Sequence, residues 1–166
     1  MIAAALACNP KLLIADEPTA ALDVTVQALV LDLLTELRRE FEMALILITH
    51  DLGVIADACE RALVMYAGQI VEESPIVPLF DAPRHPYTEG LLRSIPAVGA
   101  ERGQLWSIPS VVPPPWAMPR GCRFHPRCDY AQSPGCTTAP IALDREGARQ
   151  ARCVRSSALR LKGSER

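Results

Sequence analysis

The sequence contains only two lysines, Lys11 and Lys162, and neither follows a glycine-rich stretch. The phosphate-binding loop of pattern G-x-x-x-x-G-K-[S/T] is therefore not part of this chain. Apolar runs stay well short of the roughly 20 residues that a membrane-spanning helix needs. Aromatic residues make up only 5% of the chain, and the basic tail lacks the interleaved aromatics of many nucleic-acid-binding surfaces.

Cysteine is also scarce. Six cysteines are too few for a disulfide scaffold in a chain of 166 residues that is 49% hydrophobic. Four of them lie after residue 120, and in a cytosolic chain such crowding favours metal or cluster binding over disulfides. The other two, Cys8 and Cys59, have apolar neighbours and are expected to be small core residues.

The charges that are present are distributed unevenly. Residues 1–119 carry 7 Lys and Arg against 15 Asp and Glu, whereas residues 120–166 carry 10 against 4. Opposite biases of this kind indicate two regions with different roles.

Apolar periodicity predicts an α/β order in the first part of the chain. We expect helices at 1–8, 24–41 and 52–59, with Asp23 as the N-cap of the second. Continuous apolar runs predict strands at 11–15 and 44–49, buried on both faces of a parallel sheet.

The later part of the chain has a different texture. Two short strands are expected at 62–66 and 69–72, joined by the turn pair Ala67-Gly68. Prolines then recur, with one helix expected near 87–94 and an extended linker over most of 96–121.

Two carboxylates follow the first predicted strand. Asp16 and Glu17 lie at its C-terminal end, the edge where open α/β sheets bind ligands. Mg²⁺ takes oxygen ligands and is shared with nucleotide phosphates, and an adjacent carboxylate can orient an attacking water. Taken alone, an acid that caps a strand end is the simpler interpretation of Asp16, and a satisfied strand-end histidine is the simpler interpretation of His50.

The stretch LLIADEPTAALD at residues 12–23, followed by Ile48-Thr49-His50-Asp51 after the next strand, resembles the ABC ATPase family. The resemblance implies that Asp16 holds Mg²⁺ through water and that Glu17 polarises the hydrolytic water. It also implies that residues 21–23, ending in Asp23, form the D-loop that meets a partner subunit, and that His50 contacts the γ-phosphate.

The same resemblance shows which family parts the chain does not contain. The phosphate loop, the Q-loop glutamine and the Ser-Gly-Gly signature precede the Asp16 strand in the family and are absent here. We therefore expect an N-terminally truncated chain that is inactive alone. We also expect it to expose apolar faces and a sheet edge, and to dissolve poorly.

The tail carries a second resemblance. Residues 81–88 (DAPRHPYT) and 121–128 (GCRFHPRC) resemble the C-terminal extension of oligopeptide and dipeptide importer ATPases. In that subfamily the resemblance implies an iron–sulfur cluster, here on Cys122, Cys128, Cys136 and Cys153. Zinc and free thiols remain alternatives, because the spacing is looser than that of common zinc or ferredoxin sites. Arginines beside the cysteines are expected to favour thiolates: Arg123, Arg127 and Arg152.

Together these features predict an α/β fold: residues 1–80 as the C-terminal part of an ABC ATPase domain, a parallel sheet with flanking helices, and residues 81–166 as a Pro-rich, Cys-containing extension. The resemblance implies an ATPase subunit that uses ATP with Mg²⁺ on the cytoplasmic face of the inner membrane, where it is peripheral. Its partners would be a second ATPase subunit, two transmembrane permease subunits and, indirectly, a peptide-binding protein, with no nucleic acid.

Other interpretations stay open. The chain is alternatively a non-catalytic remnant or an iron–sulfur-bearing regulatory module. An ABC ATPase of DNA repair or translation shares the core motifs, although the tail argues against it. The solute, within a branch that carries peptides or nickel, is left undetermined.

Overall fold

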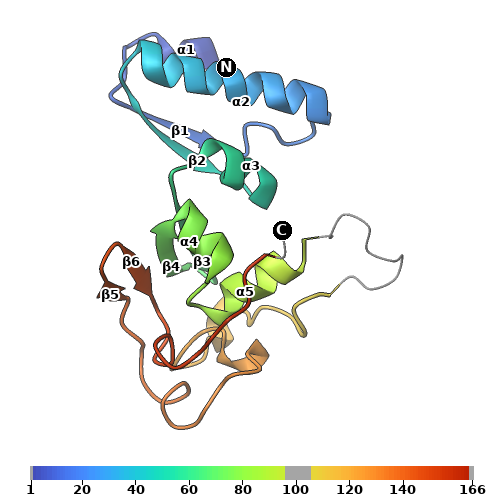
Figure 1. Cartoon of the computed structure of the whole chain (residues 1–166), viewed down its shortest axis with the longest axis vertical. Coiled ribbons are helices and arrows are strands. Elements are labelled where there is room, and N and C mark those ends of the chain that lie inside the picture. The colour runs from blue at the N-terminus through green and yellow to red at the C-terminus, as the bar shows by residue number, and fades with distance from the viewer. Residues whose placement is uncertain (1, 96–105, 165–166) are drawn as a thin grey trace. The chain divides into compact units, whose positions relative to one another are not determined.

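The computed structural model describes residues 2–95 and 106–164, and its secondary structure is mixed α/β. The chain divides into two compact units, residues 1–58 and 59–166, each of which is described by itself (Figure 1). Within the described ranges, no helix combines the length and apolar character that crossing a membrane requires.

The first unit is built around a parallel pair of strands. Its elements are, in chain order, α1 (Ile2–Leu6), β1 (Leu12–Asp16), α2 (Val24–Glu40), β2 (Ala44–Ile48) and α3 (Leu52–Ala58). The strands pair in register from Leu12 opposite Ala44 to Asp16 opposite Ile48, so both end at the same edge. These elements agree with the sequence prediction, including Asp23 as the N-cap of α2.

The core of the first unit lies on one face of this pair. Leu13 of β1, Leu34 of α2 and Met43 are buried together, and α1 and α2 cover them on one side of the strands (Figure 1). Ile14 is 58% exposed on the other face. The prediction that these strands are buried on both faces is therefore wrong for the described chain. Cys8 is exposed, so its predicted core role is also wrong.

The second unit contains an antiparallel sheet that the sequence indicated only in part. Its elements are β3 (Arg61–Tyr66), β4 (Gln69–Pro75), α4 (Ile76–Asp81), α5 (Pro86–Arg93), the short 3₁₀ helices η1 (Pro115–Ala117) and η2 (His125–Arg127), β5 (Asp144–Glu146) and β6 (Arg149–Ala151). The strand order is β3-β4-β6-β5. Ala67 and Gly68 join β3 to β4 with positive φ angles of 48° and 77°, which suits the tight turn of a hairpin.

An aromatic cluster forms one core of the second unit. Tyr66, Val71 and Phe124 are buried together, and the rings of Tyr66 and Phe124 meet edge to face with centroids 5.2 Å apart. In the predicted linker, residues 106–121 contain η1 as their regular secondary structure. Residues 96–105 of that linker lie outside the described residues.

Candidate functional site

The structure brings two of the predicted site residues together. Glu17 follows β1 and His50 follows β2, and because the strands are parallel and in register, both residues emerge at the same edge. Glu17 Oε1 lies 2.8 Å from His50 Nδ1. This hydrogen bond to a carboxylate raises the pKa of His50 above its ordinary value.

The backbone around this pair is strained. Glu17 has a φ of 47°, in the left-handed region that residues other than glycine seldom occupy. Its N–H donates to the carbonyl of Ile48 over 2.8 Å, which holds the turn against the end of β2. Ala21, in the loop before α2, has a φ of 65°. Strained residues of this kind cluster at functional sites.

The other two predicted residues of the nucleotide motifs have different surroundings. Asp16 is exposed at the last position of β1, opposite Ile48. Asp23 caps α2, where its Oδ1 accepts the N–H groups of Thr25 and Val26, each over 3.0 Å. The described contacts therefore assign Asp23 a structural task, and its proposed D-loop role remains a prediction.

Asp51 and Gln27 belong to this region but were not predicted as site residues. Asp51 Oδ1 accepts the N–H groups of Gly53 and Val54, which caps α3, and Gln27 Nε2 of α2 donates to Asp51 Oδ2 over 3.2 Å. Burial acts to raise the pKa of Asp51, but these hydrogen bonds outweigh it and the pKa is lowered. The sequence did contain a signal, because an aspartate directly preceded a predicted helix.

The second candidate site is a small cavity in the second unit, called here the cysteine cavity. It has a volume of about 20 Å³ and is lined by all four tail cysteines together with two histidines: Cys122, Cys128, Cys136, Cys153, His85 and His125. The lining residues run from His85 to Leu159, so residues up to 74 positions apart in the sequence face one space. All four sulfurs are free thiols.

Burial controls the acidity of these thiols. It raises the pKa of Cys128 to about 12, and it also raises the pKa values of Cys122 and Cys153. The predicted effect of neighbouring arginines is outweighed by burial: the charge of Arg152 acts to lower the pKa of Cys122, yet that pKa is raised overall. The guanidinium groups of the other two predicted arginines bind main-chain carbonyls. Arg123 donates to the carbonyl of Ala67, and Arg127 Nε donates to that of Pro109 over 2.8 Å.

The cysteine cavity does not fit a bound metal ion as it stands. Within residues 2–95 and 106–164, no group of three or more His, Cys, Asp or Glu side chains is placed to hold an ion. A volume of about 20 Å³ has room for about one water molecule.

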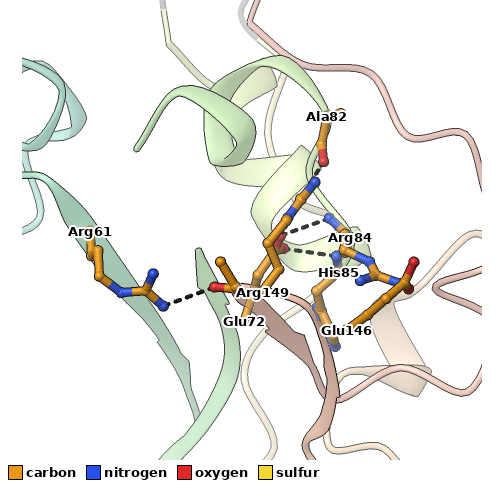
Figure 2. A network of polar contacts seen from close by, with 8 residues as sticks. Arg61, Glu72, Ala82, Arg84, His85, Glu146 and Arg149 are labelled. Atoms are coloured by element: carbon orange, nitrogen blue, oxygen red, sulfur yellow. Dashed lines mark hydrogen bonds and ion pairs between the residues drawn. The ribbon is translucent and has the colours of Figure 1, made fainter. Parts of the chain in front are cut away.

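A buried carboxylate beside the cysteine cavity was missed entirely. Glu72 of β4 has no exposed surface, and its two oxygens accept the N–H groups of Arg84 and His85, each over 2.8 Å. Arg149 of β6 completes the group with a 3.3 Å ion pair (Figure 2). His85 is 1% exposed, and burial, assisted by the charge of Arg152, lowers its pKa to about 3. At neutral pH the His85 ring is therefore uncharged.

Known proteins match most of the chain. Residues 71–136 match the family described as oligopeptide/dipeptide transporter, C-terminal region. The oligopeptide transport ATP-binding protein AppD of Bacillus subtilis (strain 168) is 53% identical over 153 residues, which are 92% of this chain and 47% of AppD. The dipeptide transport ATP-binding protein DppD of Escherichia coli (strain K12) is 50% identical over 92% of this chain, which covers 47% of DppD. DppD of Haemophilus influenzae (strain ATCC 51907 / DSM 11121 / KW20 / Rd) is 52% identical over the same share of the chain, which covers 46% of that protein.

The chain spans about half the length of these relatives. The resemblance to oligopeptide and dipeptide importer ATPases that the sequence indicated is confirmed by these matches. The chain corresponds to the C-terminal half of the ATP-binding proteins of the oligopeptide and dipeptide transporter family.

Proposed function

We propose that this chain supplies the C-terminal half of an ABC-type ATPase subunit that energises the import of oligopeptides or dipeptides across the inner membrane. The observation that carries the proposal is the 2.8 Å contact between Glu17 and His50. It joins two side chains from neighbouring parallel strands at the edge where open α/β sheets bind ligands. The names of the relatives support peptides as the transported class.

The proposed roles follow from the chemistry of each side chain. Glu17 orients and polarises the water that attacks the γ-phosphate. His50 meets that phosphate, and the raised pKa of its ring favours the imidazolium, in which the nitrogen that does not face Glu17 also carries a proton to donate. Asp23, at the end of the D-loop, faces a second ATPase subunit.

Asp16 is proposed to hold Mg²⁺, which neutralises phosphate charge when it is bound. Mg²⁺ keeps several of its waters and commonly uses one or two protein carboxylates together with phosphate oxygens. An exposed aspartate at the end of β1 fits this mode, since no cage of protein ligands is needed.

The organisation of the subunit is proposed from the motifs. Residues 1–80 form the C-terminal part of the ATPase domain and residues 81–166 form the Pro-rich, Cys-containing extension. Exposed apolar residues of the first unit, such as Ile14 at 58% and Leu29 at 63%, suit a surface that the N-terminal half of such a protein would cover. The complete subunit would sit peripherally on the cytoplasmic face of the membrane, pair with a second ATPase subunit and drive two permease subunits that receive peptide from a binding protein.

A fusion protein tests the catalytic roles. The chain would be joined behind the N-terminal part of AppD, which the chain does not match, and ATP turnover would be measured with and without Glu17→Gln. Loss of a general base is expected to lower turnover by about 10²–10⁴-fold while ATP still binds. Glu36→Gln, which changes an exposed acid on α2, is the matched control. Turnover that survives Glu17→Gln would refute the assignment.

The alternative is a non-catalytic remnant or regulatory module. It predicts that Mg·ATP leaves the melting temperature of the purified chain unchanged, since a ligand that binds the folded state stabilises it. A nucleotide-dependent rise in that temperature would count against this alternative.

We further propose an iron–sulfur cluster on Cys122, Cys128, Cys136 and Cys153, with zinc and free thiols as the alternatives. The support is that all four cysteines line one cavity. Binding would require this cavity to open, because its volume admits about one water. Anaerobic reconstitution followed by iron, sulfide and zinc analysis distinguishes the three outcomes, with Cys8→Ser as the control for a cysteine outside the cavity.

A further inference from the structure

His85 is the most deeply enclosed polar residue that lines the cysteine cavity. Its side chain is 1% exposed and makes contacts through both ring nitrogens. Nδ1 accepts the N–H of Tyr87 over 3.0 Å, which caps α5, and Nε2 lies 3.9 Å from Cys122 Sγ. The two contacts lie on opposite sides of one imidazole and therefore constrain each other.

The helix cap fixes the tautomer of this ring. A nitrogen that accepts a hydrogen bond carries no proton, so Nδ1 is unprotonated. The single proton of the neutral ring is then on Nε2, which makes that nitrogen a donor. Sulfur is a weak acceptor, and Cys122 Sγ is the group that this N–H meets.

The surroundings hold the ring in this orientation. The backbone N–H groups of Arg84 and His85 both donate to the buried carboxylate of Glu72, as Figure 2 shows. The ring of Phe124 packs nearby, with its centroid 5.9 Å from that of His85. The main chain, the Nδ1 atom and the ring of His85 are thus each held by a neighbour. The ring therefore has little freedom to turn Nε2 away from the sulfur of Cys122.

We infer that His85 is a positioning residue of the cysteine cavity, one whose Nε2–H donates a hydrogen bond to Cys122 Sγ and orients that sulfur. The inference uses contacts within the protein alone and does not require a bound metal.

The tautomer can be observed directly. In the ¹⁵N-labelled, reduced chain at pH 7, long-range ¹H–¹⁵N correlations of the histidine rings report which nitrogen carries the proton. We expect an unprotonated Nδ1 and a protonated Nε2 for His85, with His50 and His125 as internal references. A proton on Nδ1, or a doubly protonated ring, would overturn the inference without the use of any variant.

The acceptor can be tested by removing one sulfur at a time. Cys122→Ala is expected to move the Hε2 resonance of His85 upfield or to lose it through faster exchange with water. Cys153→Ala removes another thiol of the same cavity and should leave the resonance in place. An Hε2 signal that is insensitive to Cys122→Ala would show that the proton is directed elsewhere.

Two substitutions of His85 separate its cap from its sulfur contact. Asn is a good N-cap but is too short to reach the sulfur, so His85→Asn should keep the cap and lose the donor. Gln places an amide N–H near the position of Nε2, so His85→Gln should keep the donor to the sulfur and lose the cap. Adding Cys122→Ala should move the side-chain amide ¹H resonances of the His85→Gln variant and leave those of the His85→Asn variant in place; an insensitive Gln amide would contradict the role.

Discussion

Replacing Glu72 with alanine should be among the most damaging single substitutions in the second unit. Its carboxylate has no exposed surface and accepts two backbone N–H groups, those of Arg84 and His85, at 2.8 Å each. It also pairs with Arg149 over 3.3 Å. β4, the connection between α4 and α5, and β6 therefore all depend on one side chain.

The size of the effect follows from what alanine leaves behind. Each backbone N–H that loses its only acceptor in a buried site costs about 1–3 kcal/mol, and breaking a buried charge pair costs about 3–5 kcal/mol. Because the same carboxylate serves all three contacts, these costs overlap, and we expect a loss of about 3–5 kcal/mol in the free energy of unfolding. Glu72→Gln keeps one acceptor oxygen but turns an amide toward a donor, so about 1–3 kcal/mol is expected.

Urea unfolding followed by tryptophan fluorescence provides the assay. Trp106 reports on the second unit, because the Arg93 guanidinium of α5 lies 4.2 Å from the centroid of its ring. Trp116, which is 87% exposed, would be changed to Phe in every variant so that one tryptophan gives the signal. A shift of the unfolding midpoint at constant slope measures the change in stability.

Glu73 supplies the matched control on the same strand. It pairs with Arg61 over 2.7 Å and accepts from Gln150 over 2.7 Å, but its side chain keeps 21% of its surface exposed. Partly exposed pairs contribute about 0–1 kcal/mol, so Glu73→Ala should be mild. If Glu72→Ala costs no more than Glu73→Ala, the reasoning from buried N–H groups is refuted.

Three further predictions concern the first unit. In Glu17→Gln the pKa of His50 should fall toward 6.5, as measured by an NMR titration, and an unchanged pKa would exclude the contact in solution. Because the pKa of His50 is raised in the folded state, the contact stabilises the fold below pH 6.5, and this stabilisation is lost as pH rises through the folded-state pKa. Asp23→Ala removes the cap of α2 and should cost about 0.5–2 kcal/mol by urea unfolding, whereas Asp23→Asn should cost little. Ala21→Gly relieves a φ of 65° that costs an L-residue about 1–2 kcal/mol, so even after the entropy cost of glycine it should not destabilise the chain.

Local sequence patterns were sufficient for most elements of the first unit. The run before Asp16 and the helical spacing after Asp23 each depend on neighbours a few residues away, and both elements form where predicted. The meeting of Glu17 and His50 could be anticipated because parallel strands end at a common edge. The apolar pattern could not predict which faces of the strands are buried, because an apolar run shows that a strand can be buried but does not show whether other elements cover it. Ile14 is exposed for this reason.

The second unit shows where local patterns fail. Pairing between β4 and β6 joins Glu72 to Ala151, and no feature near Glu72 marks it as a carboxylate destined for complete burial. The helix α4 was missed because it is short and contains Pro78, which ordinarily argues against a helix interior. His85 directly precedes α5 and caps it, but its approach to Cys122 depends on a fold that brings together residues 37 positions apart.

Many arginines of the tail donate to main-chain carbonyls, both in the tail and elsewhere in the second unit. A segment with few helices and strands leaves many carbonyl groups without a partner, and buried carbonyls need one. Guanidinium groups meet this need through five N–H donors each. Main-chain carbonyls of the second unit accept from Arg123, Arg127, Arg149, Arg152 and Arg155. Arginines of residues 120–166 thus hold main chain of the second unit in place by hydrogen bonds, while burial raises the pKa values of the thiols despite the nearby positive charge.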